Sequence, residues 1–135
     1  MTEDSIVRGD TTKTIIQKLR NKGAKEVHIF VTFPRIIGPC FYGVDMATYS
    51  ELIGSTHNAE EIARIIGADT VSYLSNEGFV KATEFAKEDM CLGCITGQYP
   101  TPLAQKIADR MKERFLGGYK ETGRLYEIES EILSA

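Results

Sequence analysis

The chain has 135 residues, of which 42% are hydrophobic and 26% are charged, and its formal net charge is −3 at pH 7. This length suits one globular domain, so we expect residues 1–135 to form a single domain rather than a disordered chain. The negative charge without a basic block disfavours a nucleic-acid partner, and no apolar run approaches the roughly 20 residues that span a bilayer. We therefore expect a cytoplasmic protein without nucleic-acid or membrane partners.

An acidic pair, a glycine and two hydroxyl residues lead into the first predicted helix. Glu3 and Asp4 are adjacent, and Gly9 is followed closely by Thr11 and Thr12. Adjacent carboxylates accept hydrogen bonds from the vicinal hydroxyls of a ribose, while loop amides and the positive end of a helix hold an anionic phosphate. The stretch therefore predicts a sugar-phosphate site. The alternative is an N-terminal turn that caps an ordinary helix.

Helix and strand signals alternate in the next part of the chain. From Thr12 the apolar residues recur at helical spacing, and Gly23 predicts the end of that helix. Residues 27–33 are nearly all β-branched or aromatic, which predicts a strand buried on both faces of a parallel sheet. Pro34 ends this strand, and the segment from Arg35 to Asp45 is predicted to be irregular because it contains glycine and proline. This order is typical of an α/β crossover.

Two short helices and a strand are predicted next. Thr48 with Glu51 and Asn58 with Glu61 each match the capping-box pattern, so each pair is predicted to begin a short helix. The stretch Thr70–Leu74 is predicted to be a short strand because it is flanked by turn residues and contains β-branched and aromatic side chains. The chain is thus expected to continue its alternation of helix and strand.

The C-terminal part is predicted to be helical apart from one loop. Ser75 is predicted to cap a helix that reaches about Phe85, and the stretch Glu88–Tyr99 is predicted to be a loop. Pro102 is predicted to lie at the first position of a long helix, because proline is tolerated there and apolar residues recur every four positions after it. The stretch Leu125–Leu133 is predicted to form a terminal helix.

Three cysteines form the second candidate site. Cys91 and Cys94 are separated by two residues, and Cys40 lies in a loop that also contains glycine and proline. An odd number of cysteines in a cytosolic chain favours metal or redox chemistry over structural disulfides. A C-x-x-C pair can place both sulfurs on one iron or zinc centre. The alternative is three reduced cysteines in ordinary loops.

Zinc is a competing interpretation of these cysteines, because a histidine would complete a Cys3His site. The chain has two histidines, His28 and His57. His28 falls in the predicted strand, where a core or sheet-edge role is expected. His57 precedes a predicted helix, where it is expected to be a polar loop residue.

Five short motifs follow one another along the chain: Asp4–Gly9, Pro39–Asp45, Gly67–Asp69, Tyr73–Gly78 and Cys91–Pro100. In their residues and their order these motifs resemble the C-terminal portion of the glutamine phosphoribosylpyrophosphate amidotransferase family, over residues 3–116. The resemblance implies an α/β fold with part of a phosphoribosyltransferase-type, Rossmann-like parallel sheet and a C-terminal helical segment.

The resemblance also implies which residues bind phosphoribosylpyrophosphate. The acidic pair would contact the ribose hydroxyls, and the residues after it would wrap the 5-phosphate. The implied substrate-binding residues are Glu3, Asp4, Ser5, Ile6, Val7, Arg8, Gly9, Thr11 and Thr12.

The chain departs from the family pattern in this region. Asp10 stands where the family usually has threonine, and a carboxylate in a phosphate loop repels the anion by about 1 kcal/mol even at a screened surface. Glu3 replaces an aspartate and keeps the charge. Arg35 and Gly38 replace residues that are usually proline and histidine, so the loop before Cys40 is expected to be remodelled.

The cofactors implied by the resemblance are a 4Fe-4S cluster and magnesium. Cys40, Cys91 and Cys94 match three cluster ligands of the iron-sulfur members, and the fourth ligand comes from a part of the family that is absent here. Magnesium would accompany phosphoribosylpyrophosphate. Zinc remains the alternative metal.

The family's glutaminase domain and the first half of its transferase domain have no counterpart in this sequence. We expect the loop that begins at Glu3 to lack its anchoring strand and the sheet to have an unpaired edge. We therefore expect a homo-oligomer, or a separate chain that carries the glutaminase domain and the missing strands.

Two functions follow from these observations. The first is a fragment or split subunit of amidophosphoribosyltransferase, a pentosyltransferase (a glycosyltransferase) that makes phosphoribosylamine from phosphoribosylpyrophosphate and glutamine in the first step of purine synthesis. This chain would be inactive alone, and no residue is assigned a catalytic role. The alternative is a non-catalytic iron-sulfur or zinc-binding module that serves regulation or assembly.

Overall fold

The computed structural model describes residues 1–44, 46–119 and 121, and its core is a parallel sheet of three strands. The strands are β1 (Thr2–Glu3), β2 (His28–Val31) and β3 (Thr70–Tyr73), in the order β1-β2-β3. Helix α1 (Asp10–Asn21) connects β1 to β2. A long irregular segment followed by α2 (Ile53–Thr56) and α3 (Ala59–Ile66) connects β2 to β3. The expected α/β fold with a parallel sheet is confirmed.

The first strand is short, yet it pairs in register with the centre of the sheet. Thr2 lies opposite Phe30 and Glu3 opposite Val31, and the Thr32 amide donates to the Glu3 carbonyl oxygen at 2.9 Å. The expectation that the loop at Glu3 lacks an anchor is therefore wrong.

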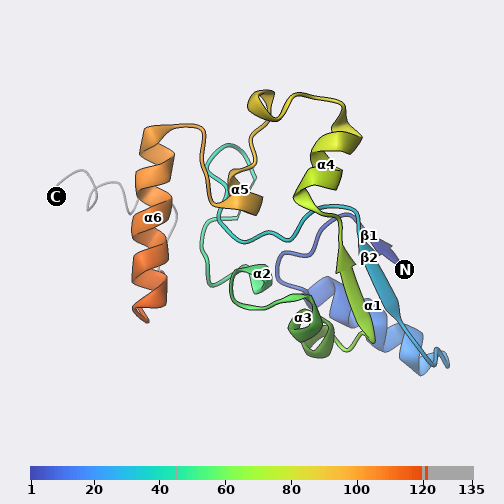
Figure 1. Cartoon of the computed structure of the whole chain (residues 1–135). Coiled ribbons are helices and arrows are strands. Elements are labelled where there is room, and N and C mark those ends of the chain that lie inside the picture. Colours follow the sequence, from blue (N-terminus) through green and yellow to red (C-terminus); the bar gives the residue numbers. More distant parts are fainter. Residues whose placement is uncertain (45, 120, 122–135) are drawn as a thin grey trace.

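The core lies between one face of the sheet and the helices α1 and α3, which cover that face (Figure 1). The buried side chains of this core come from both layers and are almost all β-branched aliphatics: Ile6, Ile16, Val27, Ile29, Val31, Ile62, Ala63, Ile66 and Val71. Burial of several such side chains, at about 1.5–3 kcal/mol each, is the main source of stability in this half of the molecule.

The opposite face of the sheet is open to solvent. Along β2, Ile29 and Val31 are buried, whereas His28 and Phe30 are exposed, and Phe30 is 50% exposed. The prediction that this strand is buried on both faces is wrong. The near-continuous apolar run arose because Val27 and Phe33 lie beyond the ends of the strand, so the four paired residues alternate between the two faces.

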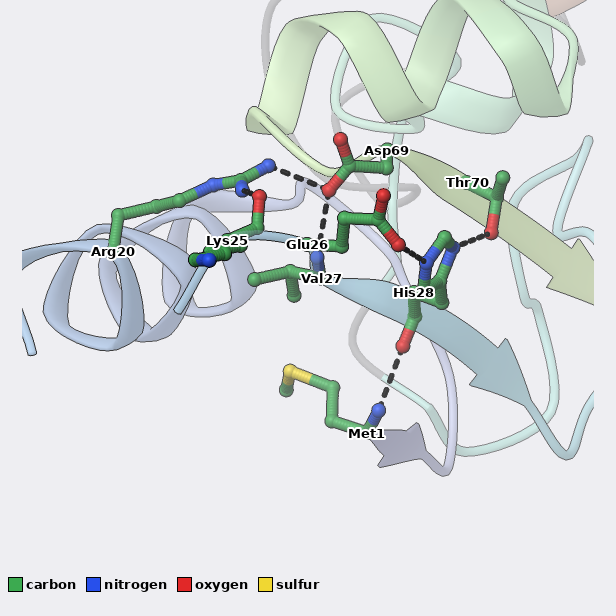
Figure 2. Close-up of polar contacts among 8 residues, drawn as sticks. All are labelled: Met1, Arg20, Lys25, Glu26, Val27, His28, Asp69 and Thr70. Carbon is green, nitrogen blue, oxygen red and sulfur yellow. Dashed lines mark hydrogen bonds and ion pairs between the residues drawn. The ribbon is translucent and has the colours of Figure 1, made fainter. Parts of the chain in front are cut away.

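A carboxylate joins three elements at the amino ends of the strands, as Figure 2 shows. One Asp69 oxygen accepts hydrogen bonds from the Val27 amide and from the Arg20 guanidinium, both at 2.6 Å. Arg20 also donates to the Lys25 carbonyl oxygen. These hydrogen bonds therefore connect the end of α1 with the starts of β2 and β3. They lie at the amino ends of the strands, at the opposite end of the sheet from the sugar-phosphate loop.

The C-terminal half extends away from the sheet (Figure 1). Helix α4 (Asn76–Thr83) follows β3 and is capped by Ser75, as predicted, and a 3-10 turn, η1, spans Lys87–Asp89. The predicted loop at 88–99 is wrong in one part, because α5 (Gly93–Thr96) lies within it. Helix α6 (Pro102–Leu116) confirms the long helix with Pro102 at its first position, and the predicted helix at 125–133 lies outside the described residues.

One of the two predicted capping boxes is present. Asn58 and Glu61 cap each other's backbone at the start of α3. Thr48 and Glu51 instead bond through their side chains at 3.1 Å, and the helix near them is α2, which begins at Ile53. The Glu51 carboxylate therefore bonds to the Thr48 side chain and to the Arg8 guanidinium, and no helix begins at this pair.

Tyr99 joins α6 to the segment that follows β2. Its hydroxyl donates to the Pro39 carbonyl oxygen at 2.7 Å, and its ring lies so close to Gly93 that a Cβ there would be 2.5 Å from it. The Ile37 and Gly38 amides both donate to the Cys94 carbonyl oxygen. These contacts hold the two cysteine-bearing segments against each other. In the part of the chain that the structure describes, no helix is long and apolar enough to cross a membrane.

We predict that Asp69→Asn lowers the free energy of unfolding near pH 7. The hydrogen bond from the Val27 amide, opposed in part by burial and supported by Arg20, lowers the pKa of Asp69 in the folded state. Its contribution is therefore complete above the unfolded carboxyl pKa of about 4 and is lost as the pH falls through the folded value. Urea titrations at several pH values measure this.

The matched control is Asp89→Asn, which changes an exposed carboxylate in η1 and should leave the unfolding midpoint nearly unchanged. A difference between Asp69→Asn and the wild type that stayed constant from pH 7 down to pH 3 would contradict the role of the charged carboxylate.

Candidate sugar-phosphate site

A hollow of about 520 Å³ lies at the carboxyl end of β1 and contains the predicted sugar-phosphate loop. In parallel α/β sheets ligands bind at the carboxyl ends of the strands, because the strand ends and helix starts converge there. All nine predicted substrate-binding residues line the hollow, together with Asp10 and two apolar residues of the following segment, Val44 and Met46.

The backbone presents hydrogen-bond donors to this hollow. Gly9 precedes α1 with φ of 86°, a left-handed conformation that favours glycine, and no side chain caps the helix there. The first amides of a helix have no intrahelical partner, so the amides of Asp10, Thr11 and Thr12 are available to an anion. Gly9 is also tightly packed, because a Cβ there would lie 3.0 Å from a methyl group of Ile66.

A segment after β2 braces the loop from outside the hollow. The Ile53 amide donates to the Val7 carbonyl oxygen at 2.9 Å, and the Arg8 guanidinium pairs with the Glu51 carboxylate. Burial acts to raise the pKa of Glu51, but hydrogen bonds from Arg8 and Thr48 outweigh it, so the net pKa is lowered. The loop is therefore held at two successive residues.

The charges that line the hollow are mostly negative. Glu3, Asp4 and Asp10 contribute three carboxylates, and Arg8 is the one cation among the residues that line it. One Asp4 oxygen accepts a hydrogen bond from the Ser5 amide at 2.6 Å, which fixes the carboxylate at the start of the loop. A phosphate in this hollow would meet helix amides on one side and carboxylates on the other.

The three cysteines come together from distant parts of the sequence. Burial, and then the neighbouring Cys40 and Cys91 thiols, raise the pKa of Cys94 to about 11. Cys40 and Cys94 pack against a small core of Ile36, Met46 and Leu52, whereas Cys91 is exposed.

The cysteines are near one another but are not arranged as ligands of one ion. Within residues 1–44, 46–119 and 121, no three His, Cys, Asp or Glu side chains are placed to hold a metal. Cys40 and Cys94 are partly buried and Cys91 is exposed, and cysteine thiolates are the ligands that iron-sulfur clusters and structural zinc take.

The two histidines are engaged elsewhere. The His28 ring contacts Thr70 at 2.9 Å and Glu26 at 3.2 Å at the amino edge of the sheet (Figure 2), and the His57 ring contacts Thr56 at 2.8 Å after α2. Their positions agree with the expected sheet-edge and loop roles.

Sequence reasoning missed three residues of the site. Val44 and Met46 line the hollow, and Glu51 pairs with Arg8. Val44 falls within one of the quoted motifs, Pro39–Asp45, and that was the available signal. Glu51 was assigned to a helix cap because its spacing from Thr48 matched a local pattern.

Comparisons with known proteins identify relatives of this chain. Amidophosphoribosyltransferase of Methanocaldococcus jannaschii is 52% identical over 111 residues, which cover 82% of this chain and 23% of that protein. The enzyme of the same name from Bacillus subtilis is 47% identical over 121 residues, which cover 86% of this chain and 25% of that protein. The chain thus spans about a quarter of the length of these curated relatives. No protein-family model matches the chain.

Solved structures agree with the sequence relatives. Glutamine phosphoribosylpyrophosphate amidotransferase from B. subtilis, complexed with ADP and GMP, superposes with a TM-score of 0.70 at 50% identity, over 76% of this chain and 24% of that one. A structure described as the allosteric regulatory enzyme of purine biosynthesis gives a TM-score of 0.68 at 50% identity. The chain is therefore homologous to amidophosphoribosyltransferase and corresponds to the C-terminal part of the phosphoribosyltransferase domain of that enzyme.

Proposed function

We propose that the chain is a fragment or subunit of amidophosphoribosyltransferase that binds the ribose 5-phosphate portion of phosphoribosylpyrophosphate in the hollow lined by residues 3–12. The observation that carries this proposal is the convergence of two carboxylates and an uncapped helix start on one hollow at the carboxyl end of β1. The reaction would displace pyrophosphate from the sugar by ammonia, in the first step of purine synthesis.

Different residues would bind different parts of the ligand. The Glu3 and Asp4 carboxylates accept hydrogen bonds from the two ribose hydroxyls, as vicinal diols require two acceptors. The amides at the start of α1 donate to the 5-phosphate, and the Thr11 and Thr12 hydroxyls add donors beside them. The backbone does most of this binding, so the rigidity of the loop matters more than the identity of Ile6 and Val7.

Magnesium fits this site only together with the ligand. No three acidic or histidine side chains within the described ranges form a cage, and magnesium in phosphate sites takes many of its ligands from substrate oxygens and water. When bound with the diphosphate group, magnesium supplies positive charge that offsets Glu3, Asp4 and Asp10. The protein contributes the position of the sugar.

We predict that Asp10→Asn increases the affinity for ribose 5-phosphate about fivefold, because it removes roughly 1 kcal/mol of repulsion between the carboxylate and the phosphate. The same change should slightly reduce stability, because a carboxylate in the first turn interacts favourably with the helix dipole. Calorimetric titration and thermal unfolding measure the two effects.

The opposite signs of these effects make the test specific. Asp89→Asn removes an exposed carboxylate in η1, distant in sequence from the hollow, and should change neither quantity. Unchanged or weaker binding by Asp10→Asn would place the phosphate away from the start of α1.

We also propose that catalysis needs the rest of the enzyme, either in the same polypeptide or in another chain. The matched region is about a quarter of the relatives' length, and the sheet has an open face that carries Phe30. A second polypeptide segment, or a second copy of this chain, would cover that face and complete the sheet beside β1.

We predict that the 135 residues alone form no phosphoribosylamine from phosphoribosylpyrophosphate, magnesium and ammonia, although they bind ribose 5-phosphate. Product formation above a protein-free blank measures this.

Sedimentation over a range of concentrations should show self-association, because exposed apolar surface on a sheet face favours a partner. Turnover by a compact monomer would refute the proposal.

A metal-binding module is the second candidate function, and it is favoured because Cys40 and Cys94 pack against the same small core and Cys91 lies three positions before Cys94. Because the sulfurs are not arranged as ligands here, binding would require the exposed Cys91 segment to move and Cys94 to lose its proton. Iron-sulfur assembly, with a fourth ligand from outside this chain, is one form of this candidate, and zinc binding is the other.

We predict that anaerobic reconstitution loads iron onto the wild type, that binding releases protons, and that Cys94→Ser removes most of the bound iron. Metal analysis and visible absorption measure the loading. Ser50→Ala, an exposed position, serves as the control. If neither iron nor zinc remains bound after gel filtration, the three cysteines do not form a metal site in this chain.

A further inference from the structure

The ion pair between Arg8 and Glu51 lies at the border of the hollow, and Glu51 has so far been given only a bracing contact to the loop. Arg8 lines the hollow, whereas Glu51 is not among the residues that line it. The cation that an incoming phosphate would meet is therefore already paired with a carboxylate outside the hollow. The arrangement raises the question of what this carboxylate does to anion binding.

Glu51 is held firmly, and Arg8 is held loosely. The second Glu51 oxygen accepts a hydrogen bond from the Thr48 hydroxyl at 3.1 Å, and the Thr48 side chain is buried. Arg8 contributes one guanidinium nitrogen, Nη2, to the pair, and its side chain is 57% exposed. Glu51 would therefore keep its place if Arg8 left it.

A phosphate monoester competes well for such an arginine. The guanidinium group has five donors in a planar fork that matches phosphate oxygens in pairs, and here the pair with Glu51 uses one of its nitrogens. Exposed ion pairs are weak, so exchange of the carboxylate for a dianionic phosphate requires little energy. The Val7 carbonyl, bonded to the Ile53 amide, keeps the loop backbone in place while the side chain moves.

We propose that the Glu51 carboxylate competes with phosphate for the Arg8 guanidinium and so lowers the affinity of the hollow for phosphate monoesters. A phosphate monoester binds Arg8 only when it displaces this carboxylate. Glu51 is in this sense a positioning residue that acts through Arg8 without touching the ligand. This inference rests on the proposed binding of a sugar phosphate by residues 3–12, and it adds a residue that neither the sequence motifs nor that proposal assigns.

The test is a double-mutant cycle with ribose 5-phosphate as the probe, titrated by calorimetry at low ionic strength. We expect Glu51→Gln to bind about two- to fivefold more tightly than the wild type, the range that corresponds to an exposed ion pair. In the Arg8→Gln background, Glu51→Gln should have no effect, because there is then no cation to release. The gain should shrink as salt is added, since screening weakens the competing pair.

Glu88→Gln is the matched control, because it removes an exposed carboxylate in η1 and should leave the affinity unchanged. Glu51→Ala is a second variant that also lacks the carboxylate, so the same gain is expected if Glu51→Gln does not fold. Weaker or unchanged binding by both variants overturns the inference, as does an equal gain in the Arg8→Gln background. If the wild type binds ribose 5-phosphate but the variants do not differ from it in this way, only the inference about Glu51 fails. If none of the proteins binds ribose 5-phosphate, the proposed function is overturned as well.

Discussion

The parallel pairing of β1 with β2 is the constraint on which the candidate site depends. Because Thr2 and Glu3 are held beside Phe30 and Val31, the chain leaves the sheet at its carboxyl edge and turns directly into α1. The direction of β1 brings the acidic pair and the start of α1 to one hollow. A one-residue slip of this register would turn the Glu3 side chain to the other face of the sheet, since successive strand residues point in opposite directions.

The segment between β2 and α2 connects the sugar-phosphate loop with the cysteine region. A small buried core of Ile36, Met46 and Leu52 packs against Val7 of the loop and against Cys40 and Cys94. The Cys40 amide donates to the Met46 carbonyl oxygen at 2.9 Å, so the two regions share a backbone contact as well as side-chain packing. A change in the cysteine region would therefore reach the loop through closely packed side chains.

The sequence determined the local elements with good accuracy, since the signals for them are contained in short stretches. The helix after Gly9, the Asn58 and Glu61 capping box, and Pro102 at the start of α6 all appear as predicted. The order of strands and helices was also recognisable, because hydrophobic period and turn residues are local properties. The sugar-phosphate loop was also recognisable, because its nine predicted residues all fall within the short stretch 3–12, and the family resemblance named the ligand.

Tertiary structure decided which distant residues meet. No local rule distinguishes a Glu51 that caps a helix from one that pairs with Arg8, because the spacing from Thr48 suits both and the outcome depends on a residue 43 positions away. The exposure of Phe30 likewise depends on which face of the sheet the helices cover, and both α1 and α3 pack on the other one. The same reason applies to Asp69, a residue of a family motif that is bonded to Val27 and Arg20 at the sheet edge opposite the hollow. A sequence specifies which groups are present, but only the packing of the chain decides which of them compete for the same partner.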